Sequence, residues 1–445
     1  MPIKLEPSAR AIAAYVLDRV YEEKAFAAPV LDAALDRYPE LDPRERALAT
    51  ELTYGTLRTA PYLEARLAKH ASRGTNKLDP VARAHLLVAS YQVLFLERVP
   101  AFAAVSEAVR RINGARGKRV GAFANAVLRR LSEQVGADKR AELELAARQS
   151  VSSELREALV RSVGDVETAA FLDAMVAPSI GLRVRWNADR DAAIGELRSA
   201  ARGASVEPGR VSPLAVLMRG GSDPEKLALY REGKIAIQEE GAQVVALALG
   251  AAPGDAVLDA CAGRGNKTAL LLEIVGPNGA VDAADQHPQK LERLTAAQAR
   301  LGVAPRATFA VDWTIGPGEI PGGYDRVLVD APCSGIGTIG RRPDLVTRWR
   351  ASNLEGVAAR QTAILIAASE RARPGGTIVY AVCSVLREEG EDVVARALER
   401  APWLESAPFP GADARALAGE AHLLRLTPRA HGTDGYFMAS LRRRA

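Results

Sequence analysis

Residues 256–268 read Ala-Val-Leu-Asp-Ala-Cys-Ala-Gly-Arg-Gly-Asn-Lys-Thr, which is a short apolar run, a turn with two glycines and the start of a helical pattern. Similar apolar runs recur at 280–284, 326–329 and 377–380. Strands that alternate with helices form parallel sheets with helices on both faces. The sequence therefore predicts an α/β, Rossmann-like domain over residues 236–445, in which ligands bind at the carboxyl ends of the strands.

Two further domains are predicted to precede this one. Residues 1–140 are expected to be all-α, because apolar residues recur at spacings of three and four and Asp-Pro turns separate the helical segments. Residues 141–235 combine helical patterns with strand-like runs at 181–186 and 215–218, which predicts a small α+β linker module. The predicted architecture is thus multidomain.

The composition is that of a globular protein, since 48% of the 445 residues are hydrophobic and 25% are charged. No apolar run approaches the roughly 18 residues that a membrane helix needs, and residues 1–10 lack the apolar core of a signal peptide. We therefore expect a cytoplasmic protein. The odd number of cysteines, three, predicts reduced thiols. Five scattered histidines and the lack of a Cys-x-x-Cys pair predict that there is no metal site.

Basic charge is concentrated in the first predicted domain. Residues 1–140 hold 23 Lys and Arg against 16 Asp and Glu, whereas the remainder holds 36 against 38. Cations repel one another unless phosphates or solvent screen them. The stretch 110–130, which contains no acidic residue, is therefore either a solvated helical face or a nucleic-acid surface, and we favour the second. The candidate nucleic-acid-binding residues are Arg110, Arg111, Arg116, Lys118, Arg119, Arg129 and Arg130.

The loop at 261–267 is the first candidate ligand site. Glycines let a backbone approach a ligand, and a helix N-terminus attracts its polar or anionic end. The loop departs from a phosphate-binding P-loop, because Cys261 stands where that motif needs its first glycine. It also departs from a dinucleotide fingerprint, because Thr268 stands where that motif needs its third glycine. A third candidate ligand is S-adenosylmethionine, whose ribose needs a carboxylate after the second strand, where Asp285 stands. An ordinary strand–helix turn remains an equal alternative.

All three cysteines follow predicted strands of the same sheet. A lone cysteine is usually a small buried hydrophobic residue, which is our interpretation of Cys261. Cys333 follows the strand at 326–329 and shares its loop with Asp330, so an acid and a thiol can meet one bound base there. Cys383 follows the strand-like run at 377–380. For the last two cysteines, the position at the ligand-binding edge favours a function.

Segments 330–335 and 380–384, Asp-Ala-Pro-Cys-Ser-Gly and Tyr-Ala-Val-Cys-Ser, resemble motifs IV and VI of the RsmB/Sun-type (Fmu) ribosomal RNA cytosine-C5 methyltransferases. Three departures are Arg264-Gly-Asn-Lys267, where the family has Pro-Gly-Gly-Lys, Val382, where it has threonine, and Gly390, where asparagine is common in the family's Glu-Glu-Asn-Glu. None of these removes a reacting group. The resemblance extends along nearly the whole chain, to a NusB-like N-terminal domain at 52–58, 99–107 and 123–129 and to the catalytic domain at 341–344, Gln361, 374–376 and 432–437.

The resemblance implies that the third domain is an S-adenosylmethionine-dependent methyltransferase domain with a role for each candidate residue. Asp285 would hold the ribose of the cofactor, and Asp312 would lie near its adenine. Asp330 would lie near both the cofactor and the base. Cys383 would be the nucleophile, and Cys333 would assist product release. The methionine end of the cofactor would be held by Cys261, Ala262, Gly263, Arg264, Gly265, Asn266 and Lys267.

The resemblance also implies a reaction: methylation of C5 of a cytosine in 16S small-subunit rRNA, through a covalent adduct between Cys383 and C6 of the base. The enzyme would act as a monomer, with RNA as its partner and without metal or membrane. Alternatives within the enzyme class are that Cys333 is the nucleophile or that another RNA is the substrate. An alternative of another class is a catalytically impaired RNA-binding factor for ribosome assembly. A small-molecule or protein methyltransferase would leave the basic domain and the second cysteine without a role.

Overall fold

The computed structural model describes residues 1–445 apart from residues 1–2, 4, 71–77, 177 and 222. The chain forms two compact units, each assembled from segments that are distant in the sequence. The first unit comprises Met1–Arg156, Leu172–Ala177 and Ile339–Trp349, and the second comprises Glu157–Phe171, Pro178–Thr338 and Arg350–Ala445.

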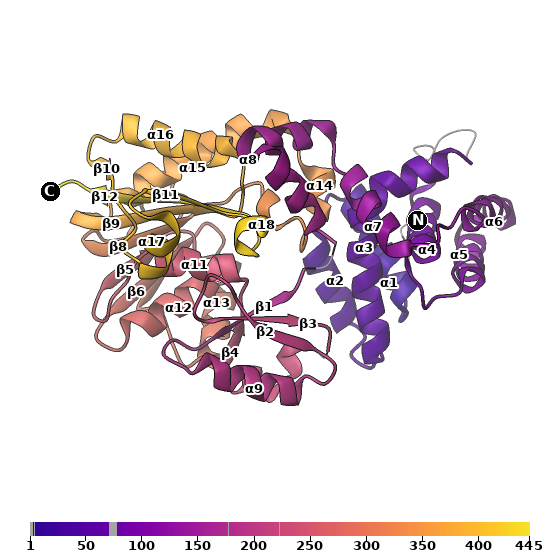
Figure 1. Cartoon of the computed structure of the whole chain (residues 1–445), viewed down its shortest axis with the longest axis horizontal. Helices are drawn as coiled ribbons and strands as arrows, with labels where there is room; N and C mark the ends of the chain where they lie inside the picture. Colours follow the sequence, from indigo (N-terminus) through magenta and orange to yellow (C-terminus); the bar gives the residue numbers. More distant parts are fainter. Residues whose placement is uncertain (1–2, 4, 71–77, 177, 222) are drawn as a thin grey trace. The chain divides into compact units, whose positions relative to one another are not determined.

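The first unit is helical, as the sequence predicts (Figure 1). Two Asp-Pro turns begin helices: Asp42 and Asp79 accept hydrogen bonds from backbone nitrogens two residues later, at 2.7 Å and 3.0 Å, and proline occupies the first helical position. Helix α4 lies at the centre, since every residue except Pro80 and Arg83 is buried. The helices are α1 (Ala9–Glu22), α2 (Ala27–Asp36), α3 (Pro43–Ala68), α4 (Pro80–Phe95), α5 (Ala101–Arg116), α6 (Lys118–Ser132) and α7 (Lys139–Gln149), followed by α8 (Ser153–Asp173), which has residues in both units.

The short helix α14 (Asp344–Arg348) and its flanks also belong to the first unit. The Arg58 guanidinium donates a hydrogen bond to the carbonyl of Gly340 at 2.9 Å, and Arg348 donates to the carbonyl of Lys24 at 2.6 Å. The sequence analysis groups this segment with the sheet domain, but it packs with the helical unit.

The second unit contains a small four-stranded antiparallel sheet of order β2-β3-β1-β4. This is the α+β module that the alternating runs predict. Arg183, on β1, has a fully buried side chain whose guanidinium contacts both carboxylate oxygens of Glu273 at 2.9 Å. Because Glu273 lies on α12, this ion pair joins the module to the larger sheet. The elements are β1 (Ile180–Val184), α9 (Arg190–Ala200), β2 (Ser205–Pro208), β3 (Ala215–Arg219), α10 (Ala228–Arg231) and β4 (Ile235–Ile237).

The larger sheet has the order β10-β12-β9-β8-β5-β6-β7, with β11 paired to β12. Strands β5 to β9 are parallel to one another, as predicted. Strands β10, β11 and β12 are antiparallel additions, so the predicted parallel sheet is in fact mixed. The strands are β5 (Ala256–Asp259), β6 (Ala280–Asp285), β7 (Ala307–Ala310), β8 (Tyr324–Asp330), β9 (Ala372–Val382), β10 (Leu404–Ser406), β11 (Leu423–Leu426) and β12 (Tyr436–Arg443).

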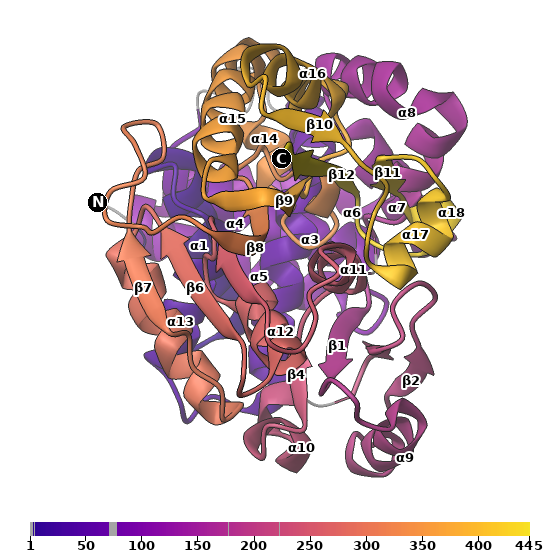
Figure 2. The same ribbon diagram turned by 90° about the vertical axis from the view of Figure 1, so that its left-hand side faces the viewer.

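Helices cover both faces of this sheet (Figures 1 and 2). On β8, Val327 and Val329 point into the core beneath α15 and α16, whereas Leu328 points into the core with α11 and α12. Helix α13 lies beside β6 and β7. Because β5, β6, β8 and β9 are parallel neighbours, the loops after them meet at one edge. The helices are α11 (Glu240–Ala248), α12 (Asn266–Val275), α13 (Pro288–Arg300), α15 (Leu354–Ser369), α16 (Glu391–Arg400), α17 (Ala412–Ala418) and α18 (Pro428–His431).

Candidate active site

The loop between β5 and α12 has two residues in the left-handed backbone region that favours glycine, and both are glycines. Gly263 and Gly265 have φ angles of 58° and 83°, and a Cβ atom at Gly265 would lie 2.4 Å from Cγ of Leu294. Asn266, which replaces a glycine of the family motif, is the first residue of α12 and does not have a positive φ. The departure from Pro-Gly-Gly-Lys therefore introduces no left-handed strain.

Asp285, at the end of β6, faces this loop. Its carboxylate accepts hydrogen bonds from the backbone nitrogens of Gly263 at 3.1 Å and of His287 at 2.9 Å. The neighbouring Gln286 donates to the carboxylate of Asp312 at 2.6 Å. Asp312 is partly exposed, and its pKa is lowered by hydrogen bonds from the hydroxyl and the backbone nitrogen of Thr314. The acids predicted to lie near the ribose and the adenine, Asp285 and Asp312, thus lie on adjoining loops.

Lys267 and Asp330 form an ion pair at the same edge. The Lys267 ammonium lies 2.6 Å from Oδ2 of Asp330, with 15% and 24% of the two side chains exposed. Burial by itself would lower the pKa of Lys267, but the charge of Asp330 and the hydrogen bond to it prevail and raise that pKa. Sequence reasoning assigned Lys267 only to the cofactor loop and missed this contact, because the two residues are 63 positions apart.

Cys333 and Cys383 are brought together as the topology predicts. Their Sγ atoms are 3.4 Å apart, on the loops that follow the adjacent parallel strands β8 and β9. The hydrogen bond with Cys383 and burial raise the pKa of Cys333 well above its ordinary value. Desolvation likewise raises the pKa of Cys261, which packs against the apolar core of the sheet. A thiol of that kind is a poor nucleophile.

Glu389 is a residue of this site that the sequence analysis did not identify. It is completely buried at the end of a single 3₁₀ turn, Arg387–Glu389, and its carboxylate binds the hydroxyls of Ser334 and Ser384. The signals that were available are the resemblance of Glu388-Glu-Gly-Glu391 to a Glu-Glu-Asn-Glu segment and the repeated Cys-Ser dipeptide, which places one serine directly after Cys333 and one after Cys383.

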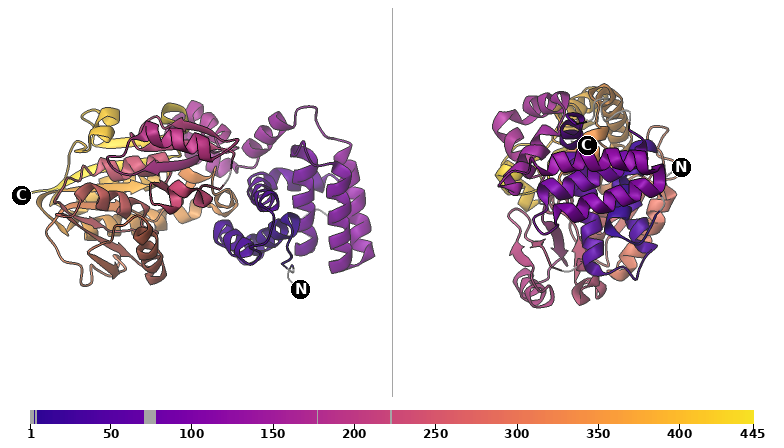
Figure 3. Two further views of the ribbon diagram at one scale, coloured as in Figure 1. Left: turned by 90° about the horizontal axis from the view of Figure 1, so that it is seen from below. Right: turned by 90° about the vertical axis from the view of Figure 1, so that its right-hand side faces the viewer.

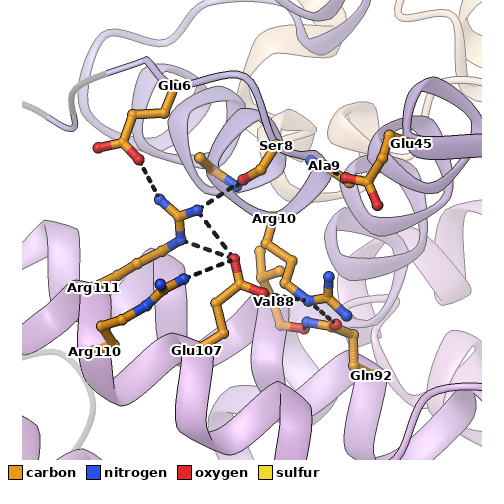
Figure 4. Close-up of polar contacts among 11 residues, drawn as sticks. Glu6, Ser8, Ala9, Arg10, Glu45, Val88, Gln92, Glu107, Arg110 and Arg111 are labelled. Carbon is orange, nitrogen blue, oxygen red and sulfur yellow. Dashed lines mark hydrogen bonds and ion pairs between the residues drawn. The ribbon is translucent and has the colours of Figure 1, made fainter. Parts of the chain in front are cut away.

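The seven candidate nucleic-acid-binding residues fall into two groups. Arg111 is held by Glu6 and Ser8, each at 2.8 Å, and by Glu107 at 3.0 Å (Figure 4). Arg116 contacts Asp79 at 2.7 Å. The stretch has no acid of its own, but the fold supplies acids from other segments. The remaining five residues are exposed: Arg110, Lys118, Arg119, Arg129 and Arg130.

Helices α5 and α6 lie side by side (Figure 3). Residues of both helices line an open groove of about 870 Å³. Three of the exposed cations, Arg110, Lys118 and Arg129, line it, together with Phe102, whose side chain is 77% exposed. Charged nitrogens beside an exposed aromatic ring form a surface that can bind phosphates and stack a base.

In the part of the chain that the structure describes, no helix is both long enough and apolar enough to cross a membrane. Within the same residues, no cluster of three or more His, Cys, Asp or Glu side chains could hold a metal ion.

Two family models match the chain. Residues 246–442 match the 16S rRNA methyltransferase RsmB/F family, and residues 7–133 match the NusB family. The first range contains the glycine loop, Cys333, Cys383 and Glu389, and the second contains α5 and α6.

Individual proteins match over almost the full length. Ribosomal RNA small subunit methyltransferase B of Pseudomonas syringae pv. tomato is 32% identical over 442 residues, which cover 97% of this chain and 96% of that protein. The Mycobacterium tuberculosis protein Rv1407 is 36% identical over 463 residues, which cover 99% of this chain and 97% of that protein. The crystal structure of PH0851 covers 100% of both chains with a TM-score of 0.81 at 25% identity.

Proposed function

We propose that this chain, which belongs to the 16S rRNA methyltransferase RsmB/F family, methylates C5 of a cytosine in 16S rRNA with S-adenosylmethionine as methyl donor. Family membership makes it a methyltransferase of small-subunit ribosomal RNA. The finer proposal rests on one observation: the sulfur atoms of Cys333 and Cys383 lie 3.4 Å apart at the ends of adjacent parallel strands.

The residues around the glycine loop fit S-adenosylmethionine. The loop 261–267 has the open backbone that the methionine end needs, Asp285 stands where a carboxylate would hold the ribose, and Asp312 adjoins it on the adenine side. When bound, S-adenosylmethionine supplies a methyl group on a positively charged sulfur.

Two thiols give the chemistry that C5 methylation requires. C5 of cytosine is too electron-poor to accept a methyl group directly, but addition of the Cys383 thiolate to C6 makes C5 an enamine carbon. After methyl transfer, the proton on C5 must leave to a base and the Cys383 sulfur must depart from C6. The high pKa of Cys333 keeps this residue as a thiol, and its S–H can stabilise the departing sulfur 3.4 Å away.

The Lys267–Asp330 pair supports the charge that develops on the ring. Thiolate addition at C6 increases the electron density at N3, so a proton shared with N3 lowers the barrier. Because the ion pair keeps the ammonium of Lys267 protonated beside Asp330, the pair can share that proton with the base. Asp330 then orients both the lysine and the cytosine.

The exposed cations of α5 and α6 would bind the RNA backbone. Phosphate contacts supply affinity that falls steeply with salt and carry little sequence information. The target cytosine must leave its stack to reach the cysteines, so a loop or transiently opened segment of the RNA is the expected substrate.

The experiment is transfer of labelled methyl from S-adenosylmethionine to unmethylated 16S rRNA, both naked and in assembled subunits, followed by nucleoside analysis. We expect 5-methylcytosine with the wild-type chain, none with Cys383→Ala, and an accumulating covalent protein–RNA adduct with Cys333→Ala. Label that persists in Cys383→Ala would move the nucleophile to Cys333. No label from any form, on either substrate, would favour the RNA-binding assembly factor.

A further inference from the structure

The carboxylate of Glu389 connects the two cysteine loops. Its Oε1 accepts a hydrogen bond from the backbone nitrogen of Ser334 at 2.7 Å. Its Oε2 accepts from the hydroxyl of Ser334 at 2.5 Å and from the hydroxyl of Ser384 at 2.6 Å. Each serine directly follows a reactive cysteine, so one buried side chain is bonded to the residue next to Cys333 and to the residue next to Cys383.

Two neighbours fix Glu389 itself. Nε2 of Gln361, on α15, donates to Oε1 of Glu389 at 3.1 Å and to the carbonyl of Pro332 at 3.0 Å. The Tyr380 hydroxyl donates to the backbone carbonyl of Glu389 at 2.6 Å. The network therefore holds the Cys333 loop on both sides of the cysteine, at Pro332 and at Ser334.

All four hydrogen-bond positions of the Glu389 carboxylate are filled. Oε1 accepts from two N–H groups and Oε2 contacts two serine hydroxyls, and among the described residues no cation forms an ion pair with Glu389. An amide at this position could keep the same four contacts, because a hydroxyl can accept as well as donate. Alanine would remove all four and leave the backbone nitrogen of Ser334 without its acceptor.

We propose that Glu389 is a positioning residue that holds Cys333 and Cys383 in the mutual geometry needed to release the methylated base. This inference rests on the proposed function and adds a residue that acts through Ser334 and Ser384 rather than by touching the RNA. Misplacement of a reacting group by about 1 Å can cost on the order of 10²-fold in rate.

A second buried carboxylate provides a matched control. Glu240 is also completely buried in the second unit, and its Oε1 accepts hydrogen bonds from the backbone nitrogens of Val211 at 2.5 Å and Ser212 at 2.9 Å. It bonds to neither cysteine loop. Glu240→Ala therefore reports what the loss of a buried, hydrogen-bonded carboxylate does to the fold alone.

The test compares Glu389→Ala, Glu389→Gln and Glu240→Ala in the full chain with 16S rRNA. Steady-state methyl transfer gives kcat and KM for RNA, and a denaturing gel gives the fraction of covalent protein–RNA adduct. In Glu389→Ala we expect kcat to fall about 10²-fold, KM to change less than about threefold, and the adduct to accumulate. Glu389→Gln, whose amide can keep the four contacts, should recover part of kcat, and Glu240→Ala should not accumulate adduct.

If Glu389→Ala does not fold, Ser334→Ala and Ser384→Ala, each of which removes one hydroxyl, are measured in its place with the same readouts. Adduct accumulation in either serine variant supports the inference. Variants that lower kcat no more than Glu240→Ala does, without adduct, overturn it. A wild-type chain that forms no 5-methylcytosine would instead contradict the proposed function, so the two failures are distinguishable.

Discussion

The α5–α6 helix pair and the cysteine edge of the sheet both concentrate charge, but in opposite ways. On the helices, five cations are exposed, and Arg110, with 75% of its side chain exposed, has only a 4.0 Å contact to Glu107. At the sheet edge, Lys267 and Asp330 are mostly buried and paired, and Glu389 is fully buried with four donors. Solvent screens the exposed cations of α5 and α6, whereas the buried charges at the sheet edge are stabilised by neighbouring protein atoms.

The difference predicts how each region responds to substitution. An exposed charge can be removed with little effect on the fold, because water replaces its contacts. A buried charge leaves its partner without a hydrogen bond or a counter-charge, at a cost of several kcal/mol. Effects at the sheet edge should therefore be large and coupled, and effects on α5 and α6 should be small, additive and dependent on salt.

The largest expected effect is on catalysis in Lys267→Met. The change removes the proton next to the ring and leaves the Asp330 carboxylate unpaired, so single-turnover methyl transfer should fall on the order of 10²- to 10⁴-fold. Lys290→Met, which removes a half-exposed cation 3.3 Å from Asp285, should have a much smaller effect. Similar rates for the two variants would contradict the assignment of the proton to Lys267.

A buried pair outside the active site tests the same contrast through stability. Arg183→Met removes a fully buried guanidinium and leaves Glu273, 3% exposed, with Arg185 and the Trp186 backbone nitrogen as its remaining donors. We expect a loss of about 3 kcal/mol in the free energy of unfolding in urea. Arg185→Met, at the one-third-exposed partner, should cost about 1 kcal/mol. Equal losses of unfolding free energy in the two variants would mean that the burial of the arginine does not determine how much its removal destabilises the fold.

The sheet edge was largely predictable from sequence because its signals are local. A strand followed by a glycine turn fixes where the loop at 261–267 lies, and parallel order brings loops 330–335 and 380–384 to one edge. The resemblance at 432–437 implied a C-terminal strand, which is β12, but its antiparallel direction and its pairing with β9 were not predicted, because a short alternating run does not reveal direction or partner.

Contacts that join distant segments were not predictable from residue types. Glu389 lies 55 residues from Ser334, and Glu6 lies 105 residues from Arg111. Nothing local distinguishes an acid that will be buried between two loops from one that faces solvent. The same limit explains the basic stretch: its lack of local acids predicted seven free cations, whereas the fold pairs Arg111 and Arg116 with acids from elsewhere.

A buried histidine beneath the basic helix pair should make stability depend on pH. His85, 6% exposed on α4, has a pKa lowered to about 4 by burial and by the charge of Arg111. Its folded pKa lies below its unfolded value of about 6.5, so its contribution is present above about pH 6.5 and is lost as the pH falls toward 4. His85→Gln should flatten the urea stability profile between pH 7 and 4.5 by up to about 3 kcal/mol. If the free energy of unfolding of His85→Gln falls with pH as steeply as that of the wild type, titratable groups other than His85 cause the loss of stability in acid.

The smallest expected effect separates two adjacent residues of α5. Arg110→Ala removes an exposed cation that lines the groove, so the affinity for 16S rRNA should fall about three- to tenfold, and the slope of log affinity against log salt should decrease by about 0.7 to 0.9. Unfolding in urea should not change.

Arg111→Ala removes a side chain that is 15% exposed and bonded to Glu6, Ser8 and Glu107, so it should cost about 1–2 kcal/mol of stability and leave the salt slope nearly unchanged. RNA binding measured at several KCl concentrations, with urea unfolding in parallel, checks both. If the slope of log affinity against log salt decreases equally in the two variants, both arginines contact phosphate. The acids around Arg111 then do not prevent its contact with RNA.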